Sequence, residues 1–152
     1  MMNISETNHT QEVREYQLIM KNDIREVTKL SAFLKEVLEK LNFVPSVATQ
    51  YRLAIEESVV NVMQYAYPID TEGYIEVRIR KDGDRVKTMI VDGGSPFDPT
   101  SQKEPDTSLS AEERQIGGLG IHLMRKLVDA IIYERIEEQN VLTLVKELRI
   151  EN

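Results

Sequence analysis

A segment of alternating apolar and charged residues that turns back at Asp82-Gly83 limits the folds open to this chain more than any other stretch. Residues 75–79 place an apolar side chain at every second position, as in a strand with one buried face. An Asp-Gly pair supplies the positive φ that a tight hairpin requires, so residues 86–91 are expected to return antiparallel to the first strand. This part of the chain therefore predicts an antiparallel sheet.

Two helical patterns precede the hairpin. Residues 23–41 open with the Asp-x-x-Glu form of a capping box and continue with apolar residues at helical spacing. A second helix is expected to begin at Ser46, as its N-cap, and to run to about Tyr67, where Pro68 stops it. Before both helices, the β-branched and apolar residues of segment 13–20 predict a first strand.

The remaining segments complete an α+β pattern. Residues 100–116 are polar and irregular, as expected of a lid-like loop, and the glycine-bearing residues 117–120 should lead into a helix from Ile121 to about Asp129. Two last strands are expected at 130–135 and 141–148. Grouped helices and antiparallel strands predict a two-layer α/β sandwich, formed by one domain over residues 13–152 after a polar, frayed tail at 1–12.

Composition narrows the classes of function. The chain has 152 residues, 41% of them apolar, which is enough for one domain with a sizeable core. It has no cysteine, so disulfides and thiolate sites are excluded, and no apolar run long enough for a membrane span. The net charge of −7 argues against binding nucleic acid. The expected location is the cytoplasm, without contact to a membrane.

Glu57 and Asn61 are the first candidate functional residues. They lie four residues apart in the second helix and therefore share a face. The carboxylate can accept a proton, and the carboxamide offers a neutral oxygen to a hard cation such as Mg²⁺. The apolar residues at 47, 51, 55, 59 and 62 mark a different stripe. The alternative is that both residues belong to a solvated helix surface.

Two glycine-bearing segments add to this pair. Asp92 ends a strand and could accept a hydrogen bond from an adenine amino group, with Gly94 allowing the base to approach, although an Asp before Gly-Gly is also a common turn former. Gly117, Gly118 and Gly120 precede a helix whose first N–H groups could bind a polyphosphate, or they form a mobile hinge. The chain contains neither a P-loop nor a dinucleotide-binding fingerprint.

Three segments together resemble a known family: Glu57-x-x-x-Asn61, Asp92-x-Gly94-x-x-Phe97-Asp98-Pro99 and Gly117-Gly118-Leu119-Gly120-Ile121. Their order is similar to the N box and the two glycine boxes of the histidine kinase-like (GHKL, or Bergerat-fold) ATPases. The short single-domain form most resembles the anti-sigma factor serine/threonine kinases. The resemblance implies a mixed, largely antiparallel sheet covered by helices on one face.

Residue by residue, the resemblance implies roles in catalysis and in adenine recognition. Glu57 would be the base that activates the attacking hydroxyl, and Asn61 would bind the Mg²⁺ that accompanies ATP. Asp92 would bind the adenine amino group, and Gly94 would line the base pocket.

The resemblance also implies residues that bind the phosphates. Gly117, Gly118 and Gly120 would surround the phosphates, and Arg114 in the lid would contact them. Thr143 in the final strand would place a hydroxyl near adenine.

The function implied is that of an ATP-binding anti-sigma factor, a bacterial protein that phosphorylates a Ser or Thr of an anti-anti-sigma (STAS-like) antagonist and also binds a sigma factor. A homodimer is the assembly that the resemblance implies. The family commonly has His where this chain has Tyr65, which does not titrate near neutral pH. A non-catalytic ATP-gated binding module, or a structural domain without nucleotide, is therefore the alternative. Neither His9 nor His122 is placed as a phospho-acceptor.

Overall fold

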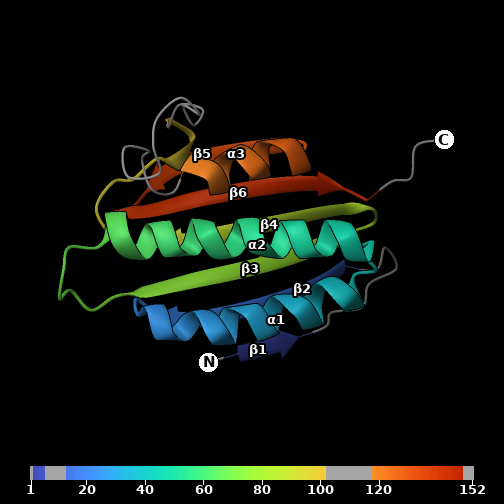
Figure 1. The fold of residues 1–152 in the computed structure, drawn as a ribbon, viewed down its shortest axis with the longest axis horizontal. Helices are drawn as coiled ribbons and strands as arrows, with labels where there is room; N and C mark the ends of the chain where they lie inside the picture. The colour runs from blue at the N-terminus through green and yellow to red at the C-terminus, as the bar shows by residue number, and fades with distance from the viewer. Residues whose placement is uncertain (1, 6–12, 102–117, 149–152) are drawn as a thin grey trace.

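The computed structural model describes residues 2–5, 13–101 and 118–148, which form a sheet with helices packed on one face (Figure 1). The elements in chain order are β1 (Met2–Ser5), β2 (Val13–Lys21), η1 (Ile24–Glu26), α1 (Val27–Lys40), α2 (Pro45–Asn61), η2 (Val62–Ala66), β3 (Tyr74–Asp82), β4 (Arg85–Asp92), η3 (Pro99–Ser101), α3 (Gly118–Leu127), β5 (Ala130–Ile136) and β6 (Gln139–Glu147). The predicted α+β class and two-layer architecture are confirmed.

The described strands form one six-stranded sheet in the order β1-β2-β3-β4-β6-β5. Every pair of neighbours in it is antiparallel, so the mixed character implied by the family resemblance is wrong for these strands. The predicted hairpin joins β3 and β4, with Asp82 opposite Arg85 and Gly83 at a φ of 61°. Figure 1 shows α2 over the middle of this sheet, with α1 and α3 on either side of it.

Part of the expected N-terminal tail is ordered as a strand. Residues 2–5 form β1, which pairs antiparallel with β2 from Met2 opposite Leu18 to Ser5 opposite Glu15. The frayed tail was inferred from polar composition, but the exposed edge of β2 offers backbone N–H and C=O groups that a polar segment can also pair with. The inference was therefore wrong for these four residues.

Helix α1 packs its predicted apolar stripe into the core, with Leu30, Phe33, Leu34, Val37 and Leu38 buried. Asp23 caps the turn that precedes the helix, because its side chain accepts a hydrogen bond from the backbone N–H of Arg25 at 2.9 Å. The entry into α1 is thus a short 3₁₀ turn, η1, rather than a direct helical start.

Helix α2 begins two residues earlier than predicted. Pro45 occupies its first turn and Val44 is the N-cap, so Ser46 does not cap the helix. Tyr51, which is fully buried, anchors α2 to the sheet, since its hydroxyl hydrogen-bonds the buried Thr88 hydroxyl of β4 at 2.7 Å. This contact fixes α2 over β4, the strand that ends at Asp92.

The second helix ends at Ala66, with Tyr67 as its C-cap, close to the expected end, but its α-helical pattern stops at Asn61. Residues 62–66 form η2, a π-helical turn. Such turns hold one more residue per turn than an α-helix and change the direction of the groups that follow. The carbonyl of Ala66 at the end of η2 consequently meets the loop after β4, where it accepts a hydrogen bond from the Ser95 N–H at 2.6 Å.

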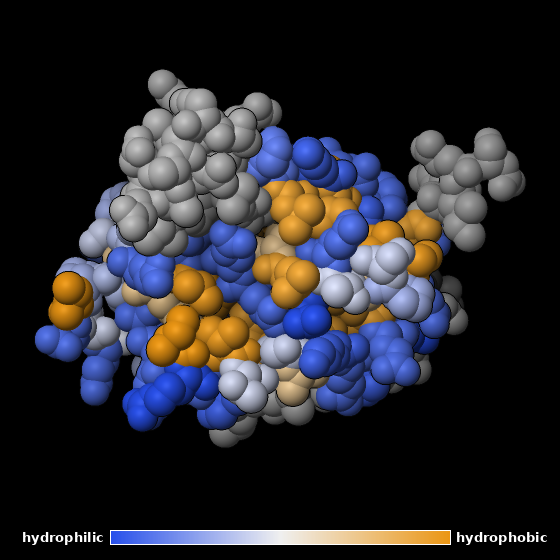
Figure 2. Space-filling view, viewed as in Figure 1, coloured by the Kyte–Doolittle hydropathy of each residue, from blue (hydrophilic) through white to orange (hydrophobic). Residues whose placement is uncertain are grey.

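Apolar side chains also reach the surface on the helix-bearing side, where Figure 2 shows them between charged ones. They include Val44 and Leu53, which are 60% and 48% exposed. Among the residues that the structure describes, no helix has the length and hydropathy that a bilayer span needs.

Candidate functional site

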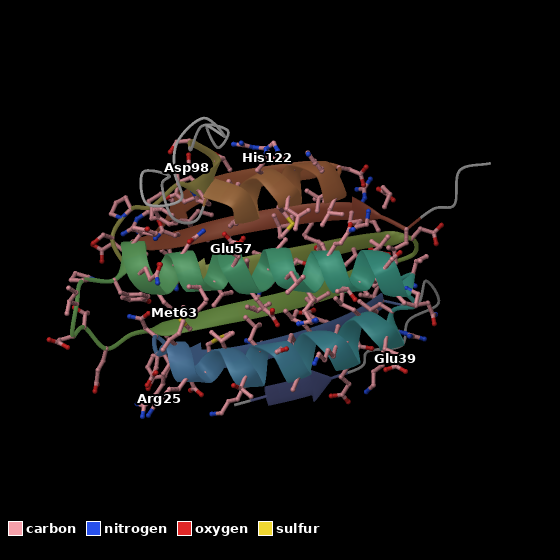
Figure 3. All side chains as sticks on the ribbon, viewed as in Figure 1. Arg25, Glu39, Glu57, Met63, Asp98 and His122 are labelled. Atoms are coloured by element: carbon pink, nitrogen blue, oxygen red, sulfur yellow. The ribbon has the colours of Figure 1, made fainter. Side chains whose placement is uncertain are left out.

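Glu57 and its neighbour Glu56 lie in contrasting surroundings. Glu56 forms an ion pair with Arg52 at 3.0 Å, and Arg52 also donates to the Ser31 hydroxyl of α1. Glu57 is half-buried, and it forms no hydrogen bond or ion pair with any described residue. Figure 3 shows Glu57 on the edge of α2 nearer to α3, with Met63 on the edge nearer to α1. Glu57 is therefore a carboxylate without a structural partner in the described part of the chain.

Asn61 follows one helical turn after Glu57, on the same side of α2. It is the last residue of the α-helical segment and is only 3% exposed. A carboxamide is seldom buried on a helix without a reason that involves its polar atoms. Burial of Asn61 beside a half-buried carboxylate speaks against the solvated-surface alternative for this pair.

Asp92 lies at the end of β4 and is 2% exposed. Its Oδ1 accepts two hydrogen bonds, from the Gly94 N–H and from Asn140 Nδ2, both at 2.9 Å. Its Oδ2 accepts none from the described residues. Burial raises the pKa of this carboxyl above its usual value, while these hydrogen bonds and the nearby Arg135 charge act in the opposite direction. One oxygen of a buried acid is thus left for another donor.

Asn140 is a site residue that sequence reasoning missed. It lies directly opposite Asp92 in the β4–β6 ladder and is 4% exposed. Its Nδ2 donates to Asp92 Oδ1 and to the Ser95 carbonyl, and its Oδ1 accepts from the Phe97 N–H. The only signal available from the sequence is the register between two strands 48 residues apart, which no local pattern reveals.

Gly94 is required by packing against the end of η2. A Cβ at this position would lie 2.5 Å from the Ala66 carbonyl oxygen. At Gly93 a Cβ would meet only the Tyr67 hydroxyl, at 3.9 Å, which accepts a hydrogen bond from the Gly93 N–H. The glycine at 94 is thus explained by a protein contact, and its role beside a base stays a proposal.

Thr143 does not lie with Asp92, contrary to the expectation for a hydroxyl near adenine. Residues directly opposite in a ladder share a face, and faces alternate along each strand. Asp92 pairs with Asn140, whereas Thr143 pairs with Met89, three positions away. An odd number of steps places Thr143 on the face of the sheet opposite to Asp92 and the helices, so this assignment was wrong.

The predicted phosphate-binding residues are only partly described. Gly118 and Gly120 lie in the first turn of α3, at the end where a helix presents free N–H groups. Arg114 and Gly117 lie outside the described residues, as do residues 102–116 of the expected lid. Thr100, at the start of that segment, belongs to η3, and its carbonyl accepts a hydrogen bond from Arg125 of α3 at 2.6 Å.

Tyr65, where the family commonly has His, stacks on Phe97. Their ring centroids are 5.8 Å apart and their planes are inclined by 26°. The stack joins η2 to the loop after β4, in parallel with the Ser95–Ala66 hydrogen bond. Tyr65 therefore has a packing role at the end of the helix that carries Glu57 and Asn61.

These groups fit a purine nucleotide with a divalent cation. Asp92 offers a buried acceptor, α3 offers its N-terminal N–H groups to phosphates, and Asn61 offers a neutral oxygen. The described residues contain no cluster of three or more His, Cys, Asp or Glu side chains that could hold a metal by itself.

Comparison with known proteins points to one family. The model of the histidine kinase-like ATPase domain matches residues 20–146. The serine/threonine-protein kinase BtrW of Bordetella bronchiseptica is 32% identical over 92 residues, covering 60% of this chain and 65% of that protein. The serine-protein kinase RsbW of Bacillus subtilis is 28% identical over 103 residues, covering 64% of each. The chain thus spans just under two thirds of the length of these curated relatives.

A solved structure supports the fold. The crystal structure of RsbU and RsbW domains from Mycobacterium tuberculosis superposes with a TM-score of 0.60 and covers 86% of this chain and 32% of that one. The sequence identity is 20%, so the likeness concerns the fold alone.

Proposed function

Because the chain belongs to the histidine kinase-like ATPase domain family, we propose that it is a Mg²⁺·ATP-dependent kinase that phosphorylates a Ser or Thr of a protein. The kinase names of its relatives support this proposal, although those relatives match over only part of their length. The family match concerns the ATPase domain. The transfer of phosphate to a Ser or Thr of a protein is the part that we propose.

The observation that carries the proposal is the state of Glu57. A glutamate on a helix surface usually forms an i,i+4 pair or is fully solvated, as Glu56 illustrates with Arg52. Glu57 is half-buried without a partner in the described residues, on the same side of α2 as the buried Asn61. A carboxylate left in this state is available to take a proton from an attacking hydroxyl.

The other residues bind and orient. Asp92 Oδ2 would accept a hydrogen bond from the exocyclic amino group of adenine, the N-terminal N–H groups of α3 would bind the phosphates, and Asn61 would supply an oxygen to the cation. When bound, Mg²⁺·ATP supplies the phosphoryl group and neutralises its charge. Glu57 then holds the hydroxyl proton of the protein substrate during attack.

The partners in this proposal follow from the resemblance to the anti-sigma factor serine/threonine kinases. The substrate would be an anti-anti-sigma protein of the STAS-like type, and the second partner a sigma factor, so that phosphorylation regulates transcription by partner switching in the cytoplasm. A homodimer would be the assembled form.

The test compares two adjacent glutamates on one helix. Glu57→Gln keeps the size of the side chain and removes its basicity, so ATP affinity should be retained while phosphotransfer falls by about 10²–10⁴-fold. Glu56→Gln is the matched control, because it removes a charge that pairs with Arg52 and should leave transfer near the wild-type rate. Transfer of ³²P from ATP to a purified STAS-like antagonist protein is the measurement.

Two results would contradict the proposal. Equal rates for Glu57→Gln and wild type would reject the assigned base. ATP binding without any transfer by the wild type would favour the alternative, a non-catalytic switch module in which the nucleotide gates a protein interface.

A further inference from the structure

We infer that Asn140 is a specificity-determining positioning residue, which orients Asp92 so that one fixed carboxylate oxygen selects a 6-amino purine over a 6-oxo purine. This inference deepens the proposed function and rests on its assignment of the nucleotide site to Asp92. It concerns a residue that acts through Asp92 and does not itself contact the base.

The two carboxylate oxygens of Asp92 differ in their hydrogen bonds. Oδ1 accepts from the Gly94 N–H and from Asn140 Nδ2, both at 2.9 Å. These two donors hold the plane of the carboxylate, and Oδ2 accepts no hydrogen bond from the described residues. With Oδ1 occupied on both sides, a ligand that hydrogen-bonds Asp92 has Oδ2 available to it.

The Asn140 amide has one orientation. Its Oδ1 receives three donors, the Phe97 N–H at 3.1 Å, the Tyr133 hydroxyl at 2.5 Å and Arg135 Nη1 at 3.2 Å. Its Nδ2 faces two acceptors, Asp92 Oδ1 and the Ser95 carbonyl at 2.8 Å. A flipped amide would set donors against donors and acceptors against acceptors, so the network determines the orientation.

The state of the Asp92 carboxylate determines which purine it can bind. Burial raises the pKa of Asp92, and the hydrogen bonds that Asn140 and Gly94 donate to Oδ1 act against this rise. They favour the carboxylate form, whose Oδ2 is an acceptor that matches the amino group at position 6 of adenine. A 6-oxo purine would place a carbonyl oxygen there, and two acceptors would face each other in a buried site. Without the Asn140 donor, Asp92 can rotate or take up a proton and then donate to a 6-oxo group. The discrimination should therefore depend on Asn140.

Both ends of the amide are buried, which makes substitution informative. Asp92 and Asn140 are 2% and 4% exposed, so water does not simply replace the lost donor. Tyr133→Phe offers a matched control, because it removes a hydrogen bond from the opposite end of the same amide and leaves the Asn140–Asp92 contact in place.

The experiment measures the affinities of ATP and inosine triphosphate by calorimetry for wild type, Asn140→Leu and Tyr133→Phe, with denaturant unfolding of each. The wild type should prefer ATP, Asn140→Leu should lose at least about tenfold of that preference, and Tyr133→Phe should keep it within about threefold. If Asn140→Leu does not fold, Asn140→Ala, which adds no side chain against Asp92, takes its place.

Either of two results with the variants overturns the inference: an unchanged ATP preference without Asn140, or the same loss in Tyr133→Phe. A wild type that binds both nucleotides equally also overturns it. Failure of phosphotransfer with the ATP preference and its dependence on Asn140 intact would contradict the kinase proposal alone, because this measurement involves no protein substrate.

Discussion

Gly94→Ala should destabilise the protein far more than the same change at its neighbour Gly93. A methyl group at 94 would lie 2.5 Å from the carbonyl oxygen and 2.8 Å from the carbonyl carbon of Ala66, so the two backbones must separate by roughly 1 Å. That movement opens the 2.6 Å hydrogen bond from the Ser95 N–H to the same carbonyl. Overpacking costs about 1–3 kcal/mol and a lost hydrogen bond about 0.5–1.5 kcal/mol, or about 2–4 kcal/mol together.

The matched control is Gly93→Ala. A methyl group there would meet only the Tyr67 hydroxyl, at an ordinary contact distance of 3.9 Å, so the free energy of unfolding should change by no more than about 0.5 kcal/mol. Urea unfolding of both variants gives the comparison through the transition midpoints. Equal midpoints for the two variants would refute the packing account and return Gly94 to a role defined by the ligand alone.

Three further predictions concern the charged and polar groups of the site. Asn61→Ala removes the proposed cation ligand, so Mg²⁺-dependent ATP affinity and phosphotransfer should fall together, and calorimetry with and without Mg²⁺ tests this; unchanged affinity would place the cation elsewhere. Asp92→Asn should weaken ATP binding while the fold is retained, which circular dichroism and calorimetry can separate; wild-type affinity would remove the adenine assignment. Burial raises the pKa of Asp92, so ATP affinity should fall as pH drops through that raised pKa. Over the same window the contribution of this group to the free energy of unfolding should rise, because the folded state binds the proton more tightly than the unfolded state. Wild type and Asp92→Asn with identical pH profiles would contradict the last prediction.

Local sequence patterns were sufficient to predict most of the helices and strands. The alternation before Asp82-Gly83 predicted β3 and β4, and helical spacing predicted α1, because each signal depends on residues close in sequence. The resemblance based on the three boxes is confirmed by the family match over residues 20–146. Glu57 and Asn61 were recognised because their i,i+4 spacing alone places them on one side of a helix.

What escaped prediction depends on contacts between distant segments. Thr143 was assigned without knowledge of the β4–β6 register, and one step along a strand decides the face on which a side chain lies. Asn140 was missed for the same reason. Strand β1 was missed because its pairing uses backbone groups, which composition does not report. The end of the second helix near Tyr67 was predicted from Pro68, but the π-helical form of residues 62–66 was not, because apolar spacing does not distinguish it from an α-helix.

In the segment between Asn61 and Pro68, the π-helical turn η2 constrains the number of residues more than their identity. Exchanging the exposed Gln64 for another polar side chain leaves the backbone path unchanged. Deleting a single codon there would let the turn relax into an ordinary α-helix and swing everything after it by about 100° around the helix axis. The Ala66 carbonyl would then point away from Ser95. Related proteins should therefore tolerate amino-acid substitutions in this segment while keeping its number of residues constant.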